Sequence, residues 1–209
     1  MTSEFQTVAD EFRYEIERIK NSRFLTTVAP ADSVEAALEF VGRVGEEFSG
    51  ANHNCWAFRL GRDGAVFRSS DDGEPGGSAG RPILQQLEGH GLTELVVVVT
   101  RWFGGTKLGV GGLMRAYGGA AGQTLDRAPL RRVVITRRLT VEHPYDCSAA
   151  VSGLFAARSI TPVGSTYDAE VRLELQLPEL EVEEFCRELR DCTAARATVS
   201  FPDGDAPAS

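Results

Sequence analysis

The feature that most constrains the fold is the apolar run "ELVVVVTRWF" at residues 94–103, which is apolar on both faces. Such a run is typical of a central strand covered on both sides. It leads directly into a glycine track, since seven of the nineteen residues from Arg101 to Gly119 are glycine. Arg101, Lys107 and Arg115 add positive charge to this track. Three explanations fit: a phosphate cradle, a tight turn without a ligand, or a docking surface for a macromolecule.

The segments around this strand predict an N-terminal domain over residues 1–132 with the order β-β-α-β-β-α-β-α. "FRYEIERIK" and "SRFLTTVA" are strand-like, and "CWAFRLG" and "AVFRSS" flank an Asp-Gly turn, which is typical of a hairpin. "DSVEAALEFVGRVGEEF" has helical periodicity, with Asp32 or Ser33 as N-cap. The helix after the central strand carries one apolar stripe: Leu113, Ala116, Tyr117, Ala120, Ala121 and Leu125.

Residues 133–203 predict a second domain with the order βαββαβ, the ferredoxin-like arrangement. "RRLTVEH" is its first strand, and "DCSAAVSGLFAAR" is a helix with Asp146 as cap. The small polar residues 204–209 are expected to form a flexible tail. The whole chain is therefore expected to be an α+β protein of two domains.

Composition and charge exclude several classes of function. No apolar run approaches the roughly 20 residues of a membrane helix, and "MTSEFQTVADEF" lacks the features of a signal peptide. We expect a cytoplasmic protein without membrane contact, whose four cysteines are reduced and mostly buried thiols. The net charge is −8, with −2 in residues 1–135 and −6 in residues 136–209. We expect no DNA binding, and any RNA contact must come from a local basic patch.

The glycine track does not fit either common nucleotide-binding motif. Val110 and Gly111 stand where a P-loop requires Lys-Ser/Thr, and Met114 stands where the dinucleotide motif requires glycine. Gly118 and Gly119 fall inside a helix, so we expect them to serve helix–sheet packing. Anion contact and pure turn geometry stay open for the rest. The candidate partner- or phosphate-binding residues are Arg101, Gly104, Gly105, Lys107, Gly109, Gly111, Gly112 and Arg115.

A second candidate is the acidic segment "SSDDGEPGG". Asp71, Asp72 and Glu74 could hold a divalent cation or supply a general base. "DDGEP" is also an ordinary turn, and residue chemistry favours that interpretation. His53 and Cys55 share one strand face, and we interpret both as packing residues. We predict no catalytic residue, no metal and no cofactor.

The chain resembles the IMPACT/YigZ family. The resemblance rests on "SDDGEPGGSAGRPIL" and "VVVVTRWFGGTKLGVGGLMRAYGGAA", together with "NHNCWAFRL" and "EIERIKNSRFLTTVAP". It implies an N-terminal domain with the fold of the second domain of a small-subunit ribosomal protein. It also implies a ferredoxin-like C-terminal domain akin to those of elongation factor G. Eukaryotic members regulate a translation-factor kinase largely through a separate RWD domain, for which this chain has no room, so that role is not carried over.

For bacterial-type members the resemblance implies an interaction with RNA, ribosomes or a translation-related protein. We therefore expect a non-enzymatic factor that modulates translation or a stress response. The alternative is an enzyme or binding protein for a phosphorylated small molecule or nucleotide, which uses the glycine-rich loop. The oligomeric state is not predicted.

Overall fold

The computed structural model describes residues 3–202 of an α+β protein. The chain divides into two compact units between Val133 and Val134. The expected tail at residues 204–209 lies outside the described residues. Within residues 3–202, none of the helices combines the length and apolar character that crossing a bilayer requires.

The N-terminal unit is built on a five-stranded antiparallel sheet. The strand order is β2-β3-β6-β4-β5, so β6 lies at the centre and pairs with β3 and β4, as the apolar run predicts. Leu60 faces Val66 across the predicted hairpin turn. The strands are β2 (Phe12–Glu15), β3 (Arg23–Pro30), β4 (His53–Leu60), β5 (Val66–Ser70) and β6 (Leu95–Trp102).

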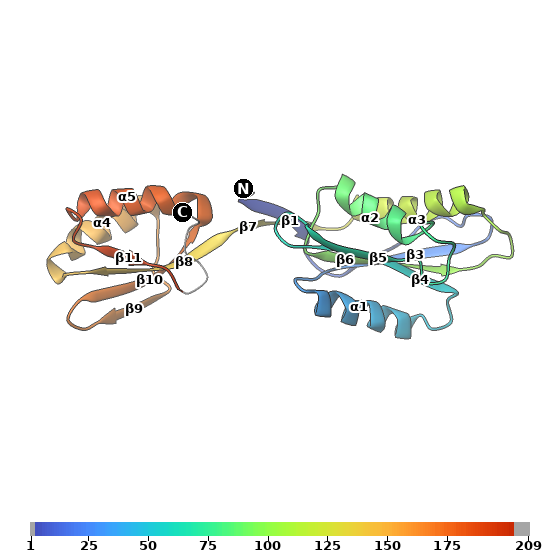
Figure 1. Ribbon diagram of the computed structural model, residues 1–209, viewed down its shortest axis with the longest axis horizontal. Helices are drawn as coiled ribbons and strands as arrows, with labels where there is room; N and C mark the ends of the chain where they lie inside the picture. Colours follow the sequence, from blue (N-terminus) through green and yellow to red (C-terminus); the bar gives the residue numbers. More distant parts are fainter. Residues whose placement is uncertain (1–2, 203–209) are drawn as a thin grey trace. The chain divides into compact units, whose positions relative to one another are not determined.

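Helices cover both faces of this sheet (Figure 1). Helix α1 (Val34–Glu47) lies on one face, and α2 (Gly80–Gly89) and α3 (Val110–Leu125) lie together on the other. Ser33, one of the two predicted caps, accepts a hydrogen bond from the Ala36 N–H at 3.2 Å. The sheet is therefore the middle of three layers.

The side chains of β6 alternate between two cores, because successive strand residues point to opposite faces. Val96 and Val98 pack in the core beneath α1. Val97 and Val99 pack in the core beneath α2 and α3. The continuous apolar run therefore follows from helices on both sides of the strand.

Two strands of the N-terminal unit were not predicted. β1 (Glu4–Val8) pairs with β7 (Leu130–Val134) in a separate two-stranded sheet. The predicted strand at residues 12–20 is also too long, since β2 ends at Glu15. The chain turns sharply at Lys20 and Asn21, whose φ angles are 46° and 66°. This turn brings Ser22 next to the end of β6.

The second unit has the predicted order βαββαβ. Its sheet order is β11-β8-β10-β9, and α4 and α5 lie on one side of it (Figure 1). The elements are β8 (Thr136–His143), α4 (Ser148–Arg158), β9 (Gly164–Tyr167), β10 (Val171–Pro178), α5 (Val182–Cys192) and β11 (Thr198–Ser200).

Two expectations about side chains need correction. Asp146 does not cap α4, because it lies in a short 3-10 turn (Tyr145–Cys147) and accepts a hydrogen bond from Arg196 at 2.5 Å. All four cysteines are free thiols, but only Cys55 and Cys147 are buried. Cys186 is half-buried and Cys192 is exposed, so the expectation of mostly buried thiols holds for two of them.

Candidate functional site

The alternation of β6 decides where Arg101 points. Arg101 continues the series of Val97 and Val99, so its side chain enters the core beneath α3. Only 4% of the residue is exposed. The sequence suggested Arg101 as a surface contact for phosphate or a partner. That placement is wrong, because the strand pleat turns the guanidinium inward.

Glu74 balances the charge of Arg101. A nitrogen of the guanidinium (Nη1) donates to Glu74 Oε1 at 2.5 Å, and both side chains are 5% exposed. The hydroxyl of Tyr117 on α3 donates to the same oxygen at 2.7 Å. The two motifs singled out in the sequence therefore meet inside the domain, in an ion pair that α3 covers.

The other contacts of Arg101 come from Ser22, just before β3, and from aromatic rings. Its Nη2 lies 3.3 Å from the Ser22 hydroxyl, and its guanidinium carbon lies 5.5 Å from the ring centres of Phe24 and Phe103. Its Nε is buried and has no hydrogen-bond partner within the described part of the chain. The two rings favour the positive charge of the guanidinium, but they do not replace a hydrogen-bond acceptor for Nε.

Asp71 shapes the loop that carries Glu74. Its carboxylate accepts hydrogen bonds from the backbone N–H groups of Gly77, Ala79 and Gly80 at 2.7 to 2.9 Å. Gly80 is the first residue of α2 and Ala79 its N-cap residue, so Asp71 caps this helix from nine residues before its start. Burial acts to raise the pKa of Asp71, but the three hydrogen bonds outweigh it and the pKa is lowered.

Asp72 and His53 fasten the loop to β4. Asp72 accepts a hydrogen bond from the Asn54 N–H at 2.5 Å, and its carbonyl oxygen lies 2.7 Å from His53 Nδ1. The other ring nitrogen of His53 is 3.9 Å from Glu74 Oε1. The three carboxylates of the acidic segment thus bond to the protein itself, as the turn interpretation requires. Within residues 3–202, no cluster of three or more His, Cys, Asp or Glu is arranged to hold a metal ion.

Cys55 lies on the same strand face as His53, as predicted. Its Sγ donates to the Asp71 carbonyl oxygen at 3.0 Å. Burial raises the pKa of the Cys55 thiol to about 12, so the thiol stays protonated at neutral pH. Burial also raises the pKa of Tyr117, so its hydroxyl stays protonated and donates a hydrogen bond to Glu74. Neither group is activated as a nucleophile.

The first glycines of the track serve close packing and helix entry. A Cβ on Gly104 would overlap the backbone of Asn21, and the Gly104 N–H donates to the Ser22 hydroxyl at 3.1 Å. Gly109 has a φ of 73° and starts α3 without a side-chain cap from the described residues. The first amides of α3, at Val110, Gly111 and Gly112, therefore have no helical acceptor. Gly105 and Gly111 are exposed, and Gly112 is half-buried.

The exposed part of the track carries two cations without acidic partners. Lys107 and Arg115 are exposed, and neither forms an ion pair with any residue from 3 to 202. A Cβ built on Gly111 would lie 3.7 Å from Arg115 Nη1, which places this guanidinium beside the first turn of α3. We call Phe103, Gly104–Gly112, Met114 and Arg115 the β6–α3 surface.

The prediction that Gly118 and Gly119 serve helix–sheet packing is wrong. Added methyl groups on Gly118 would touch Pro82 of α2 at 3.6 Å, so this glycine serves helix–helix rather than helix–sheet packing. Gly119 has open space around its Cα. Gly122, further along α3, is the tighter position, because a Cβ there would lie 2.6 Å from the Gln86 side chain.

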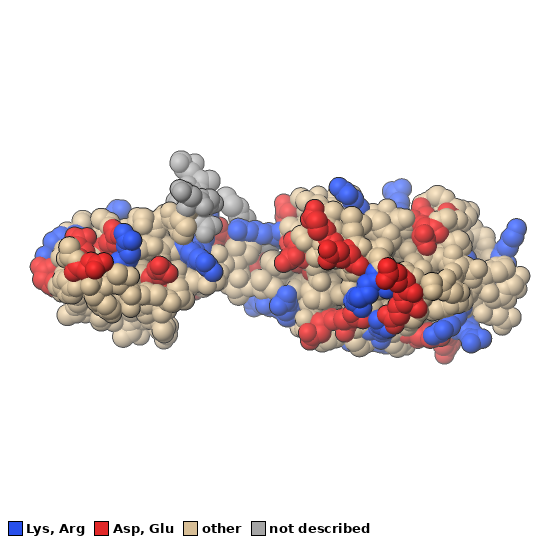
Figure 2. Space-filling view, turned by 90° about the horizontal axis from the view of Figure 1, so that it is seen from below, with Lys and Arg blue, Asp and Glu red and all other residues tan. Residues whose placement is uncertain are grey.

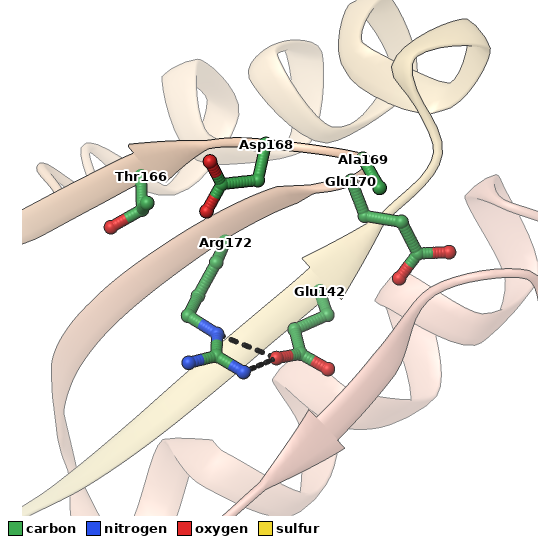
Figure 3. Close-up of a pocket in the computed structure, with 6 residues that line it drawn as sticks. All are labelled: Glu142, Thr166, Asp168, Ala169, Glu170 and Arg172. Carbon is green, nitrogen blue, oxygen red and sulfur yellow. Dashed lines mark hydrogen bonds and ion pairs between the residues drawn. The ribbon is translucent and has the colours of Figure 1, made fainter.

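Two other surfaces have a charge pattern unlike that of the β6–α3 surface. Figure 2, seen from the α1 side, shows both signs interspersed over the N-terminal unit. On that unit Glu11 bonds both Arg13 and Arg43. Figure 3 shows a hollow at the β9–β10 turn, where Arg172 pairs with Glu142 and two more carboxylates, Asp168 and Glu170, line the wall. At the hollow, the cation among the lining residues is therefore already paired with a carboxylate.

Sequence reasoning did not identify Ser22, Phe103 or Tyr117 as parts of the site. Tyr117 could have been identified from the sequence, because a tyrosine in the apolar stripe of a helix needs a buried hydrogen-bond partner for its hydroxyl. Phe103 left a weaker signal, as an aromatic residue that begins a glycine-rich loop. Ser22 left none, since its position depends on the pairing of Arg23 with Trp102.

Two family profiles match the chain. The profile described as "Impact N-terminal domain" matches residues 20–125. A second, described as "Domain of unknown function (DUF1949)", matches residues 141–196. Each profile falls within one of the two units.

Individual relatives extend over most of the chain. "IMPACT family member YigZ" of Escherichia coli (strain K12) is 40% identical over 178 residues, which are 84% of this chain and 87% of that protein. "IMPACT family member in pol 5'region" of Thermus thermophilus is 43% identical over 160 residues, or 77% and 86% of the two chains. A solved structure described as "Crystal structure of an hypothetical protein" is 35% identical. It covers 98% of this chain and 100% of its own, with a TM-score of 0.69.

The buried ion pair predicts a large loss of stability in Glu74→Gln. The substitution leaves the Arg101 charge buried without a counter-charge, so the free energy of unfolding should fall by about 3–5 kcal/mol. Urea denaturation measures this change. The matched control is Glu15→Gln, which removes the partner of Arg23 in an exposed ion pair and should have a much smaller effect. An equal loss in the two variants would contradict the assignment.

The cap of α2 predicts a pH-dependent effect of Asp71→Asn. The pKa of Asp71 is lowered in the folded protein, so its carboxylate stabilises the fold above the unfolded pKa of about 3.9. This stability is lost as the pH falls through the folded pKa. Asp71→Asn should therefore lower the free energy of unfolding by about 1–3 kcal/mol at neutral pH. The difference from wild type should shrink in acid, and a constant difference would argue against the cap.

Proposed function

Because this chain belongs to the IMPACT family, as a bacterial-type member with two domains, we propose that it is a non-enzymatic RNA-binding factor. It acts on translation by contacting RNA, free or in the ribosome, through the β6–α3 surface. The observation that carries the proposal is the pair of exposed cations Lys107 and Arg115 beside the start of α3, where residues 3–202 supply neither an ion-pair partner nor a side-chain cap. Phosphate groups are the natural ligands of such cations and of free helix amides.

The charge of the chain as a whole supports a local contact. The net charge of −8 disfavours general attraction to RNA. Several other arginines of the N-terminal unit are neutralised by carboxylates, as in the pairs of Arg13 with Glu47 and Arg23 with Glu15. Lys107 and Arg115 differ from these arginines, because neither forms an ion pair with any of residues 3–202 and their charge stays open to a ligand.

The internal contacts support binding over catalysis. Asp71, Asp72 and Glu74 are the candidate acids of the alternative enzyme, and all three already accept hydrogen bonds from the protein. An enzyme acting on a phosphorylated small molecule would need at least one acid or base free to reach its substrate. The Cys55 thiol is protonated and buried, and it supplies no nucleophile.

The test is the double variant Lys107→Ala with Arg115→Ala. It should weaken binding to ribosomes in co-sedimentation and to RNA in fluorescence anisotropy. The slope of log K against log salt should become shallower by roughly 1.4 to 1.8, since two phosphate contacts are lost. Arg101 is left intact, because its substitution would unbalance the buried Glu74.

A matched control removes two exposed cations elsewhere. Arg187→Ala with Arg190→Ala on α5 changes the net charge equally but leaves the β6–α3 surface intact. The control should bind RNA as the wild type does. Unchanged binding in the first variant, or an equal loss in both, would refute the proposed surface. Displacement of RNA by a nucleotide at low concentration would favour the small-molecule alternative.

A further inference from the structure

We infer that the β6–α3 surface takes single-stranded RNA, with one unpaired base stacked on the ring of Phe103. This inference rests on the proposed function and adds the form of RNA that is bound. Phe103 is 45% exposed, although it directly follows β6, whose residues are almost all buried. Proteins that bind single strands combine such exposed aromatic rings with cations that contact the backbone.

The backbone of Phe103 is held on both sides. Its own N–H donates to Asn52 Oδ1 at 2.8 Å, and the next N–H, of Gly104, donates to the Ser22 hydroxyl at 3.1 Å. Gly104 also lies so close to the Asn21 backbone that no side chain would fit there. The aromatic residue is therefore fixed to the end of the sheet, and ordering it for a ligand requires little further loss of entropy.

The buried ion pair of Arg101 and Glu74 lies next to the ring of Phe103 on its inner side. The guanidinium of Arg101 lies 5.5 Å from the ring centre of Phe103, and its own position is fixed by Glu74 and Ser22. Arg101 is buried, so it lies on the inner side of the ring and the exposed part of the ring faces away from the core. The ion pair thus positions the ring without contacting the ligand.

The cations lie in the same short stretch of chain. Lys107 follows Phe103 by four residues, and Arg115 folds back over the first turn of α3. A base on the ring and its neighbouring phosphates near Lys107 and Arg115 would use both kinds of contact. In duplex RNA the bases are stacked on one another and the ring could not take one. Single strands are therefore preferred.

The exposed side chains of Val110 and Met114 allow a different occupant, an apolar segment of a protein. The need for an aromatic ring distinguishes an RNA base from an apolar protein segment as the occupant. A stacked base needs the flat face of an aromatic ring, whereas an apolar segment needs only area. Phe103→Leu keeps an apolar side chain of similar size and removes the face, and Phe103→Trp enlarges it.

The experiment measures anisotropy of a labelled uridine-rich single strand of about 12 nucleotides and of a hairpin with the same number of phosphates. Wild type should bind the single strand more tightly than the hairpin. Phe103→Ala and Phe103→Leu should each weaken single-strand binding by roughly tenfold or more, and Phe103→Trp should retain it. The salt slope should not change in any of the three, because no phosphate contact is removed. Thermal unfolding of each variant confirms that the fold is kept.

Two outcomes overturn the inference. Phe103→Leu could bind the single strand as the wild type does, or the wild type could prefer the hairpin. If either occurs while Lys107→Ala with Arg115→Ala still weakens binding, the stacking of a base on Phe103 is rejected, but RNA binding by the β6–α3 surface is retained. If the wild type binds neither RNA at low salt, the proposed function itself fails.

Discussion

The buried ion pair between Glu74 and Arg101 is the interaction on which the rest of the N-terminal unit depends. It joins the central strand to the loop before α2, and Tyr117 adds α3 to the same carboxylate. Two charges that are each 5% exposed are tolerated only when both are paired and hydrogen-bonded. The loop must therefore hold Glu74 firmly, and Asp71 and Asp72 do this with four hydrogen bonds from backbone N–H groups.

Charged residues that stand close together in the sequence therefore have different roles, some in the fold and others at the surface. Arg101 and Glu74 act inside the protein, where they connect β6 to the loop before α2 and to α3, and Asp71 and Asp72 hold that loop in place. Lys107 and Arg115, a few residues further on, point to solvent. The positive charge that this stretch can offer a ligand is thus smaller than the sequence suggests, because Lys107 and Arg115 are exposed and Arg101 is not. The second unit, whose exposed Arg172 is paired with Glu142, adds none at the hollow of Figure 3.

Apart from β1 and β7, the order of the helices and the sheet strands was predictable because it follows from local patterns. Periodicity identified the helices, and the apolar run identified β6 as the central strand. The inward direction of Arg101 also follows from the sequence, through its alternation with Val97 and Val99. Its partner does not: Glu74 is 27 residues away, and the pairing depends on the conformation of a loop. Asp71 likewise caps a helix that begins nine residues later, beyond the reach of capping rules based on neighbouring residues.

The most direct test of the account is to map where RNA touches the protein. Ultraviolet crosslinking of a uridine-rich single strand to the intact chain, followed by mass spectrometry of the peptides, gives this position. The account predicts crosslinks within residues 103–115, with Phe103 as the principal site. Crosslinks confined to α1 or to the second unit, with none in residues 103–115, would contradict it.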